Sequence, residues 1–188
     1  MLTNQRTLKQ SYTFKGKGLH TGINVNMIIT PAPANHGIKF KRSDLDGEPV
    51  IDAVADYIAP SSRNTTLQKG EVVVATPEHI LAALYAMGID NALITIDGPE
   101  VPILDGSSKP YAEAFLSDGF EELDEVRKVF EVNEKIVLVD EESGAEISIY
   151  PDNDFSVEVM IDFNSRGVGH QYARYNSRSK FATECAPC

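Results

Sequence analysis

The chain has 188 residues, of which 42% are hydrophobic and 24% charged, as in a globular protein of one large or two small domains and not as in a disordered chain. Its net charge of −11 argues against nucleic acid and anionic membranes as partners, because both are themselves negatively charged. The N-terminus lacks the apolar stretch of a secretory signal, and the longest apolar run, residues 80–87, is too short to span a bilayer, so we expect a soluble cytoplasmic protein with no transmembrane segment.

The first half of the sequence predicts short strands separated by turns. Residues 25–29 are apolar with partial alternation, and a loop of turn formers at 31–37 leads to residues 38–40, which we interpret as the return strand of a hairpin. The β-branched residues 72–75 predict a short buried strand, and residues 92–96 predict another.

Two helices are predicted between and after these strands. The first covers residues 77–87, with Thr76 as its cap and Gly88 as a left-handed residue beyond its end. The second covers residues 108–116, with Pro110 near its start and Gly119 beyond its end.

An acidic run at residues 121–125 predicts a solvated connector between domains. Strand patterns restart after it, at 129–132, 136–139, 146–150 and 156–161, and residues 181–186 look helical. A weak echo of strand, proline, turn and strand joins residues 29–40 to residues 149–157 and favours a duplicated β-rich domain over chance. We therefore expect an α+β fold in which a second β-rich domain follows the first. Residues 1–124 form the first, and residues 125–188 form the start of a second, truncated one.

Glu78 and His79 are the sharpest chemical pair in the sequence. At the start of a helix, the backbone N–H groups and the helix dipole favour an ionised carboxylate and a neutral imidazole that can bind a cation. Such a pair suits a hydrolase in which the imidazole binds a metal ion and the carboxylate removes a proton from the activated water. Taken alone, the pair is better explained as an acidic residue at a helix start beside an incidental histidine, because one histidine is not a metal site.

Other segments have weaker signals. Residues 16–22 form a glycine-rich loop that fits neither the dinucleotide nor the phosphate-loop pattern; a tight turn is the default, although Lys17 and His20 could contact a phosphate. Asp105 in an Asp-Gly turn could support that turn, or could orient a metal-bound histidine. Polar residues 62–66 could line a pocket or form a plain loop. The C-terminal pair Cys185 and Cys188 has no second pair or nearby histidine, so we interpret both as incidental.

Read together, these segments resemble one family over essentially the whole chain, the UDP-3-O-acyl-N-acetylglucosamine deacetylases, which are zinc enzymes of the first committed step of lipid A synthesis. Each motif alone is weak evidence, but the occurrence of nine motifs in the same order is specific to this family. The matching motifs are Gln5-Arg6-Thr7-Leu8-Lys9, Gly18-Leu19-His20-Thr21-Gly22, Pro31-Ala32-Pro33-Ala34-Asn35, Gly37-Ile38, Thr76-Pro77-Glu78-His79-Ile80, Ala82-Ala83-Leu84, Gly88-Ile89-Asp90-Asn91, Glu100-Val101-Pro102-Ile103 and Asp105-Gly106-Ser107.

The resemblance implies two similar layered domains, each a β-sheet with helices, and an active site between them. It also implies a reaction. The parent enzyme would remove acetate from the 2-acetamido group of a UDP-linked, 3-O-acylated glucosamine, with Glu78 as general base and His79 as one of three Zn²⁺ ligands. The resemblance also places Leu19 near the acyl chain, Asn64 and Thr65 beside the pocket, and His20 near the nucleotide.

The family's other two zinc ligands form a His-x-x-x-Asp pair, which does not occur in this sequence. We therefore expect the remaining ligands beyond residue 188 and expect this chain alone to be inactive. The alternatives are a catalytically incompetent fragment and a module that binds a sugar nucleotide without metal. No pattern in the sequence points to an oligomeric state.

Overall fold

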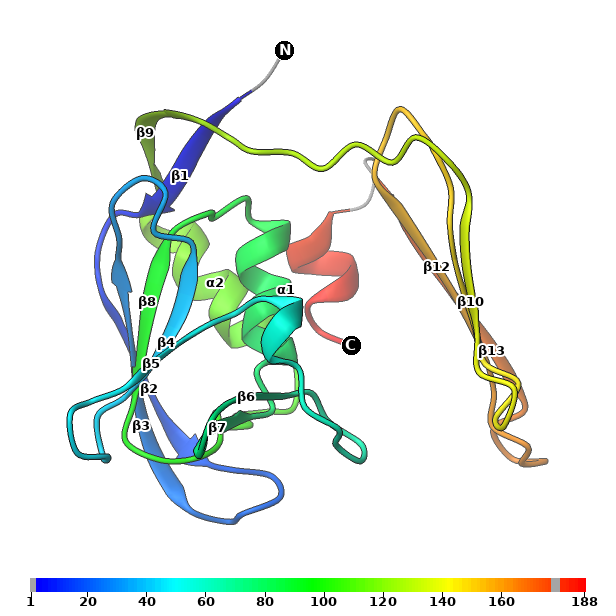
Figure 1. Ribbon diagram of the computed structural model, residues 1–188, viewed down its shortest axis with the longest axis horizontal. Helices are drawn as coiled ribbons and strands as arrows, with labels where there is room; N and C mark the ends of the chain where they lie inside the picture. The colour runs from blue at the N-terminus through cyan, green and yellow to red at the C-terminus, as the bar shows by residue number, and fades with distance from the viewer. Residues whose placement is uncertain (1–2, 177–179) are drawn as a thin grey trace. The chain divides into compact units, whose positions relative to one another are not determined.

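The computed structural model describes residues 3–176 and 180–188 (Figure 1). Contacts divide the chain into two units: unit 1 holds the residues up to Arg127 together with Phe181–Cys188, and unit 2 holds Lys128–Lys180. The boundary expected after residue 124 falls inside the last strand of unit 1. That residues 125–188 begin a second, related domain stays a prediction.

A five-stranded sheet forms the centre of unit 1. Its order is β2 (Tyr12–Lys17), β3 (Asn24–Pro31), β8 (Ala92–Ile96), β4 (Ile38–Arg42) and β5 (Val50–Asp52). Neighbouring strands are antiparallel except β4 and β8, which are parallel. The predicted hairpin of residues 25–40 is therefore wrong. The loop between β3 and β4 crosses the start of β8, where the Gly37 amide donates to Asn91 Oδ1, and β8 pairs with both strands.

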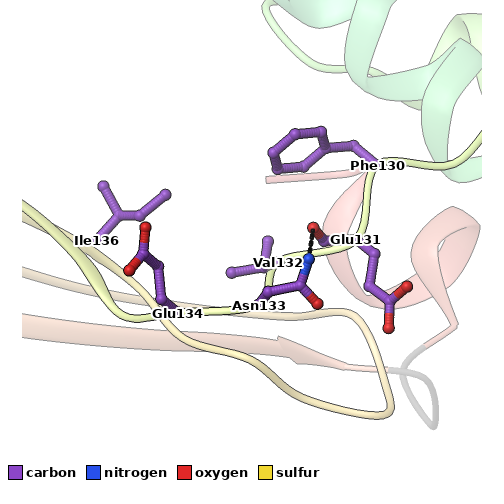
Figure 2. Close-up of a pocket in the computed structure, with 6 residues that line it drawn as sticks. All are labelled: Phe130, Glu131, Val132, Asn133, Glu134 and Ile136. Carbon is purple, nitrogen blue, oxygen red and sulfur yellow. Dashed lines mark hydrogen bonds between the residues drawn. The ribbon is translucent and has the colours of Figure 1, made fainter.

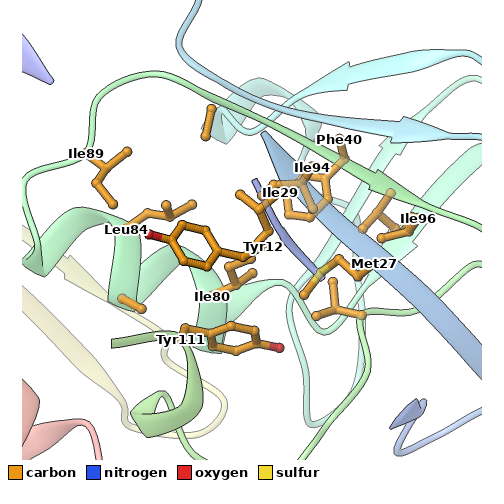
Figure 3. Close-up of a cluster of buried hydrophobic side chains, with 14 of the residues drawn as sticks. Tyr12, Met27, Ile29, Phe40, Ile80, Leu84, Ile89, Ile94, Ile96 and Tyr111 are labelled. Atoms are coloured by element: carbon orange, nitrogen blue, oxygen red, sulfur yellow. The ribbon is translucent and has the colours of Figure 1, made fainter. Parts of the chain in front are cut away.

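One face of this sheet is apolar and is covered by two helices, which confirms the α+β fold class. In β3 the buried residues alternate with residues 24, 26 and 28, which face outward. The helices α1 (Glu78–Ala86) and α2 (Lys109–Asp118) lie on the same side of the sheet (Figure 1). Figure 3 shows Ile80 and Leu84 of α1 in one cluster with Tyr12, Ile29 and Ile94 of the sheet.

The helix ends confirm the predicted glycines and correct the predicted cap. Gly88 and Gly119 both have positive φ, 70° and 74°, directly after their helices or C-caps. Thr76 does not cap α1: it has φ 59°, Pro77 is the N-cap, and the Thr76 hydroxyl donates to Glu100 instead. The helix therefore begins at Glu78, one residue later than predicted.

Two small sheets and two short turns complete unit 1. β1 (Asn4–Leu8) pairs with β9 (Phe120–Val126), and β6 (Thr66–Lys69) pairs with β7 (Val72–Ala75). A 3₁₀ turn, η1, covers Ala55–Tyr57, and a π-helical turn, η2, covers Phe181–Cys185. The acidic run 121–125 is thus strand and not a connector. Its glutamates are exposed on a strand whose backbone pairs with β1, an arrangement that charged strands at a sheet edge commonly adopt.

The described residues of unit 2 form two hairpins. β10 (Ile136–Val139) pairs with β11 (Glu146–Ile149), and β12 (Ser156–Asp162) pairs with β13 (His170–Asn176). Residues 129–132, predicted as strand, are irregular, and β13 was not predicted. None of the described side chains of unit 2 is buried. Across residues 3–176 and 180–188, no helix has the length and apolar character needed to cross a bilayer.

Candidate functional site

The chain enters α1 through a sharp turn that fixes Glu78. β7 ends at Ala75, the left-handed Thr76 redirects the backbone, and Pro77 leads into the first helical residue, Glu78. The Glu78 side chain is half-buried, and its Oε2 accepts a hydrogen bond from the Thr65 amide at 3.3 Å. One carboxylate oxygen is thereby oriented by the backbone, at the positive end of a helix dipole.

His79 is the second residue of α1 and is also half-buried. Its backbone carbonyl accepts a hydrogen bond from Ser108 Oγ at 2.8 Å, which joins the first turn of α1 to the start of α2. Within the described part of the chain, no residue hydrogen-bonds the His79 imidazole. Its ring nitrogens are thus unengaged there, as a cation ligand requires.

Thr65 and Asn64 lie in the chain just before β6, next to Glu78. Thr65 meets the turn through its backbone, since its amide donates to Glu78 and its carbonyl accepts from the Thr76 amide at 2.9 Å. Asn64 is half-buried beside it. The structure therefore brings Thr65 into direct contact with the predicted general base.

The loop that joins β2 and β3 contains Leu19 and His20, and both side chains are exposed. The loop is closed by two backbone hydrogen bonds, from Gly18 to Ile23 and from Gly22 to Gly18. The His20 amide also donates to Glu100, at 3.0 Å to Oε1. The loop is thus a fixed turn that presents two side chains outward.

Glu100, to which the sequence assigned no role, is fully buried and binds this loop to the start of α1. It accepts from the amides of His20 and Thr21, from Thr21 Oγ1 at 2.7 Å and from Thr76 Oγ1 at 3.0 Å. Burial alone raises the pKa of a carboxyl, yet these hydrogen bonds outweigh it and hold the Glu100 pKa below its ordinary value. A Cβ at Gly18 would collide with Glu100 Oε2 and with Thr21 Oγ1, so only glycine fits there.

No local pattern announces Glu100 as a site residue. Its partners lie 24 to 80 residues away in the sequence. Gly18 marks a close approach, but a glycine does not reveal which side chain approaches it.

Asp105 supports its own turn. Its Oδ1 accepts from the Ser107 amide and from Ser107 Oγ, and these bonds hold the Asp105 pKa below its ordinary value. The connection to His79 comes from Ser108, three residues later, and is made to the His79 backbone. Asp105 therefore stabilises the turn that precedes α2.

The described residues hold no group of three histidines, cysteines or carboxylates placed to bind a metal ion. Cys185 and Cys188 are free thiols. A shallow pocket in unit 2 is lined by one run of chain: Phe130, Glu131, Val132, Asn133, Glu134 and Ile136 (Figure 2). It contains none of the predicted site residues.

Comparison with known proteins gives the same family throughout. A sequence model of the family described as LpxC, UDP-3-O-acyl N-acetylglycosamine deacetylase, matches residues 5–188. A bifunctional enzyme LpxC/FabZ of Bacteroides thetaiotaomicron is 44% identical over 185 residues, which are 98% of this chain and 40% of the relative. A UDP-3-O-acyl-N-acetylglucosamine deacetylase of Myxococcus xanthus is 41% identical over 160 residues, 85% of this chain and 50% of the relative. The chain thus spans only about two fifths to one half of the length of these relatives.

Proposed function

Because the chain belongs to the UDP-3-O-acyl-N-acetylglucosamine deacetylase family, we propose that the whole protein hydrolyses the acetamide of a UDP-linked, 3-O-acylated N-acetylglucosamine. The products are the free amine and acetate, and the reaction is the committed step of lipid A synthesis. The observation that carries this assignment is the Glu78–His79 pair on the first turn of α1, with one Glu78 oxygen oriented by the Thr65 amide.

Glu78 is the general base. The Thr65 amide engages Oε2, which leaves Oε1 to take a proton from the attacking water. The water oxygen then forms a bond to the amide carbon, and the carbon–nitrogen bond breaks as the nitrogen receives a proton. Glu78 returns that proton, or an acid outside this chain supplies it.

His79 fits a zinc ion as one ligand of several. Its imidazole is half-buried and unengaged within the described residues, and its backbone is fixed by Ser108. Catalytic zinc sites use three protein ligands, so the other two come from outside this chain. When bound, zinc makes water more acidic and stabilises negative charge on the carbonyl oxygen.

We propose roles for the remaining predicted residues as well. We assign Leu19 to the acyl chain and His20 to the nucleotide, as the family resemblance implies, and both side chains are exposed on a fixed loop. Asn64 and Thr65 border the pocket beside Glu78. Asp105 keeps its turn in place and thereby delivers Ser108 to His79.

Replacement of the general base tests the mechanism. In the full-length protein, Glu78→Ala should retain bound zinc while kcat falls by at least ~100-fold, because proton transfer by a positioned carboxylate is lost. The measurements are acetate release and metal content by elemental analysis. Glu71→Ala is the control, since Glu71 is exposed in the turn between β6 and β7. Turnover of Glu78→Ala near that of Glu71→Ala would remove Glu78 from the mechanism.

We also propose that the 188-residue chain alone is inactive. One imidazole ligand does not hold catalytic zinc. Stoichiometric zinc retained by this chain through dialysis would contradict the proposal. Titration with the UDP-sugar in the presence of a chelator tests the remaining alternative, because a module that binds the sugar nucleotide without metal would still bind it.

Unit 2 begins a second domain related to the first, which we infer from strand order. In unit 1 the β2–β3 hairpin precedes the β4–β5 hairpin, and β8 lies between β3 and β4. In unit 2 the β10–β11 hairpin precedes the β12–β13 hairpin in the same way, and the described residues supply no strand between β11 and β12.

This duplication predicts hydrogen-exchange behaviour. In the full-length protein a further strand should pair with β11 and β12, so the amides of both strands should exchange more slowly than in the 188-residue chain. Equal exchange rates in the two proteins would count against a duplicated domain.

A further inference from the structure

We infer that Glu100 is a positioning residue for the proposed reaction. Its buried carboxylate holds the loop of residues 18–22 and the turn before α1 in one arrangement, so that the substrate-binding side chains and the Glu78–His79 pair stay aligned. This inference rests on the proposed function.

The segment that bears Glu100 lies between the two parts that it joins. On one side, the Ala75 amide donates to the Pro99 carbonyl, and the Val101 amide donates back to Ala75. On the other side, the Ile103 amide donates to the Lys17 carbonyl at the end of β2. Glu100 is thus placed by backbone bonds to both the end of β7 and the end of β2.

One carboxylate oxygen of Glu100 bonds to both parts, and the other bonds to the loop of residues 18–22. Oε1 accepts from the Thr76 hydroxyl, two residues before Glu78, and also from the His20 amide. Oε2 accepts from the Thr21 amide and the Thr21 hydroxyl. A shift of the loop would therefore move the same carboxylate that anchors Thr76.

Thr76 needs such an anchor because its backbone is strained. A φ of 59° is unfavourable for a β-branched residue, and such residues persist only where their surroundings enforce them. Two bonds do so here, from the Thr76 amide to the Thr65 carbonyl and from its hydroxyl to Glu100. Since Thr65 also binds Glu78, the strained turn sets the position of the general base.

Ordinary core packing does not explain why the Glu100 carboxylate is buried. An ionised carboxylate is costly to bury unless donors surround it, and an apolar side chain would fill the same space without that cost. Here the donors belong to the two parts that must meet the substrate, and Gly18 leaves room for the carboxylate.

The experiment is done in the full-length protein and tests the Thr76–Glu100 hydrogen bond separately from the Thr21–Glu100 hydrogen bond. Thr76→Val should lower kcat with KM nearly unchanged, and Thr21→Val should raise KM with kcat nearly unchanged, each by about tenfold for one lost bond to a charged group. Glu100→Gln should do both, lowering kcat/KM by about 100-fold. Thr76→Ser and Thr21→Ser keep the hydroxyls and should restore most of the loss.

Glu113→Gln is the matched control, because Glu113 is exposed on α2 and its ion pair with Lys109 is also exposed. Zinc content and melting temperature are measured for every variant, so that loss of folded protein is not counted as loss of catalysis. The variants at Thr76 and Thr21 retain the Glu100 carboxylate, so they still test the inference if Glu100→Gln does not fold.

The inference is overturned if Glu100→Gln keeps kcat/KM within about twofold of the control, or if both valine variants change kcat and KM alike. An inactive wild-type protein would instead overturn the proposed function, and this inference with it. An active wild type with the kcat and KM split above supports both.

Discussion

Units 1 and 2 use similar strands and reach different degrees of burial. In β3 of unit 1, Val25 is 1% exposed, whereas in β12 of unit 2, Val159 is 44% exposed. Both strands alternate apolar and polar side chains in part. Unit 1 has two helices over its sheet, while the described residues of unit 2 form two hairpins and no helix. Strand pattern therefore sets which face is apolar, and covering elements decide whether that face is buried.

The largest expected difference comes from removing one aromatic ring in each unit. Phe115→Ala, in the core of unit 1, should lower the free energy of unfolding by about 3–5 kcal/mol, because it leaves a cavity. Phe155→Ala in unit 2, where the ring is 53% exposed, should lower it by less than about 1 kcal/mol. Urea unfolding followed by circular dichroism measures both. Equal losses would mean that the two units are packed alike.

Hydrogen exchange should sharpen the comparison strand by strand. Amides of β3 and β8 should exchange at least about 100-fold more slowly than those of β10 and β12, because the latter belong to exposed hairpins that open locally. The rates are read by NMR on the 188-residue chain. Similar protection in all four strands would contradict the difference in burial.

A buried carboxylate should give unit 1 a pH dependence. Glu100→Gln should lower the free energy of unfolding at pH 7 by about 1.5–3 kcal/mol, the range for hydrogen bonds to a charged group. The Glu100 pKa is lowered in the folded state, so its contribution is present above the ordinary pKa of an unfolded glutamate and is lost as the pH falls through the folded value.

The stability curves of wild type and Glu100→Gln should therefore approach each other as the pH falls below the ordinary glutamate pKa, and should converge below the lowered pKa of the folded state. Glu134→Gln, exposed in unit 2, serves as the comparison and should change the free energy of unfolding by less than about 0.5 kcal/mol at any pH. A constant gap between the Glu100→Gln and wild-type curves would show that the Glu100 pKa is not lowered in the folded protein, because only a difference between the folded and unfolded pKa values makes stability depend on pH.

The smallest expected difference uses two glycines with nearly the same backbone. Gly88 in unit 1 has φ 70° and Gly144 in unit 2 has φ 74°. Gly88→Ala should lower the free energy of unfolding by about 1 kcal/mol, because an L-residue is disfavoured there. Gly144→Ala strains a hairpin that contributes little to the core, so its thermal midpoint should stay closer to wild type. Equal midpoints would indicate that both turns unfold with the same cooperative unit.

Local sequence patterns predicted where most helices and strands lie, but they did not predict which strands pair. Residues 92–96 and 136–139 match β8 and β10 at both ends, and both helices were placed by their prolines and glycines. The hairpin of residues 25–40 failed because β3 and β4 each pair with a strand more than fifty residues further along the chain. β9 was missed because its exposed acidic side chains resemble those of a loop.

The candidate site was predictable in the same uneven way. Glu78 and His79 lie at the start of a helix, as their neighbours in sequence indicate. Thr65 reaches Glu78 through its backbone amide, which no side-chain pattern encodes. Glu100 gathers donors from two distant segments, so only the folded chain shows its role.

The place of β8 between β3 and β4 has a consequence for synthesis on the ribosome. Until residue 96 has emerged, the growing chain contains the two outer hairpins and lacks the strand that joins them. Both hairpins must wait with their inner edges unpaired, and such edges invite association with other chains. Slow translation of this stretch should therefore make the nascent chain more dependent on chaperones than its small size would suggest.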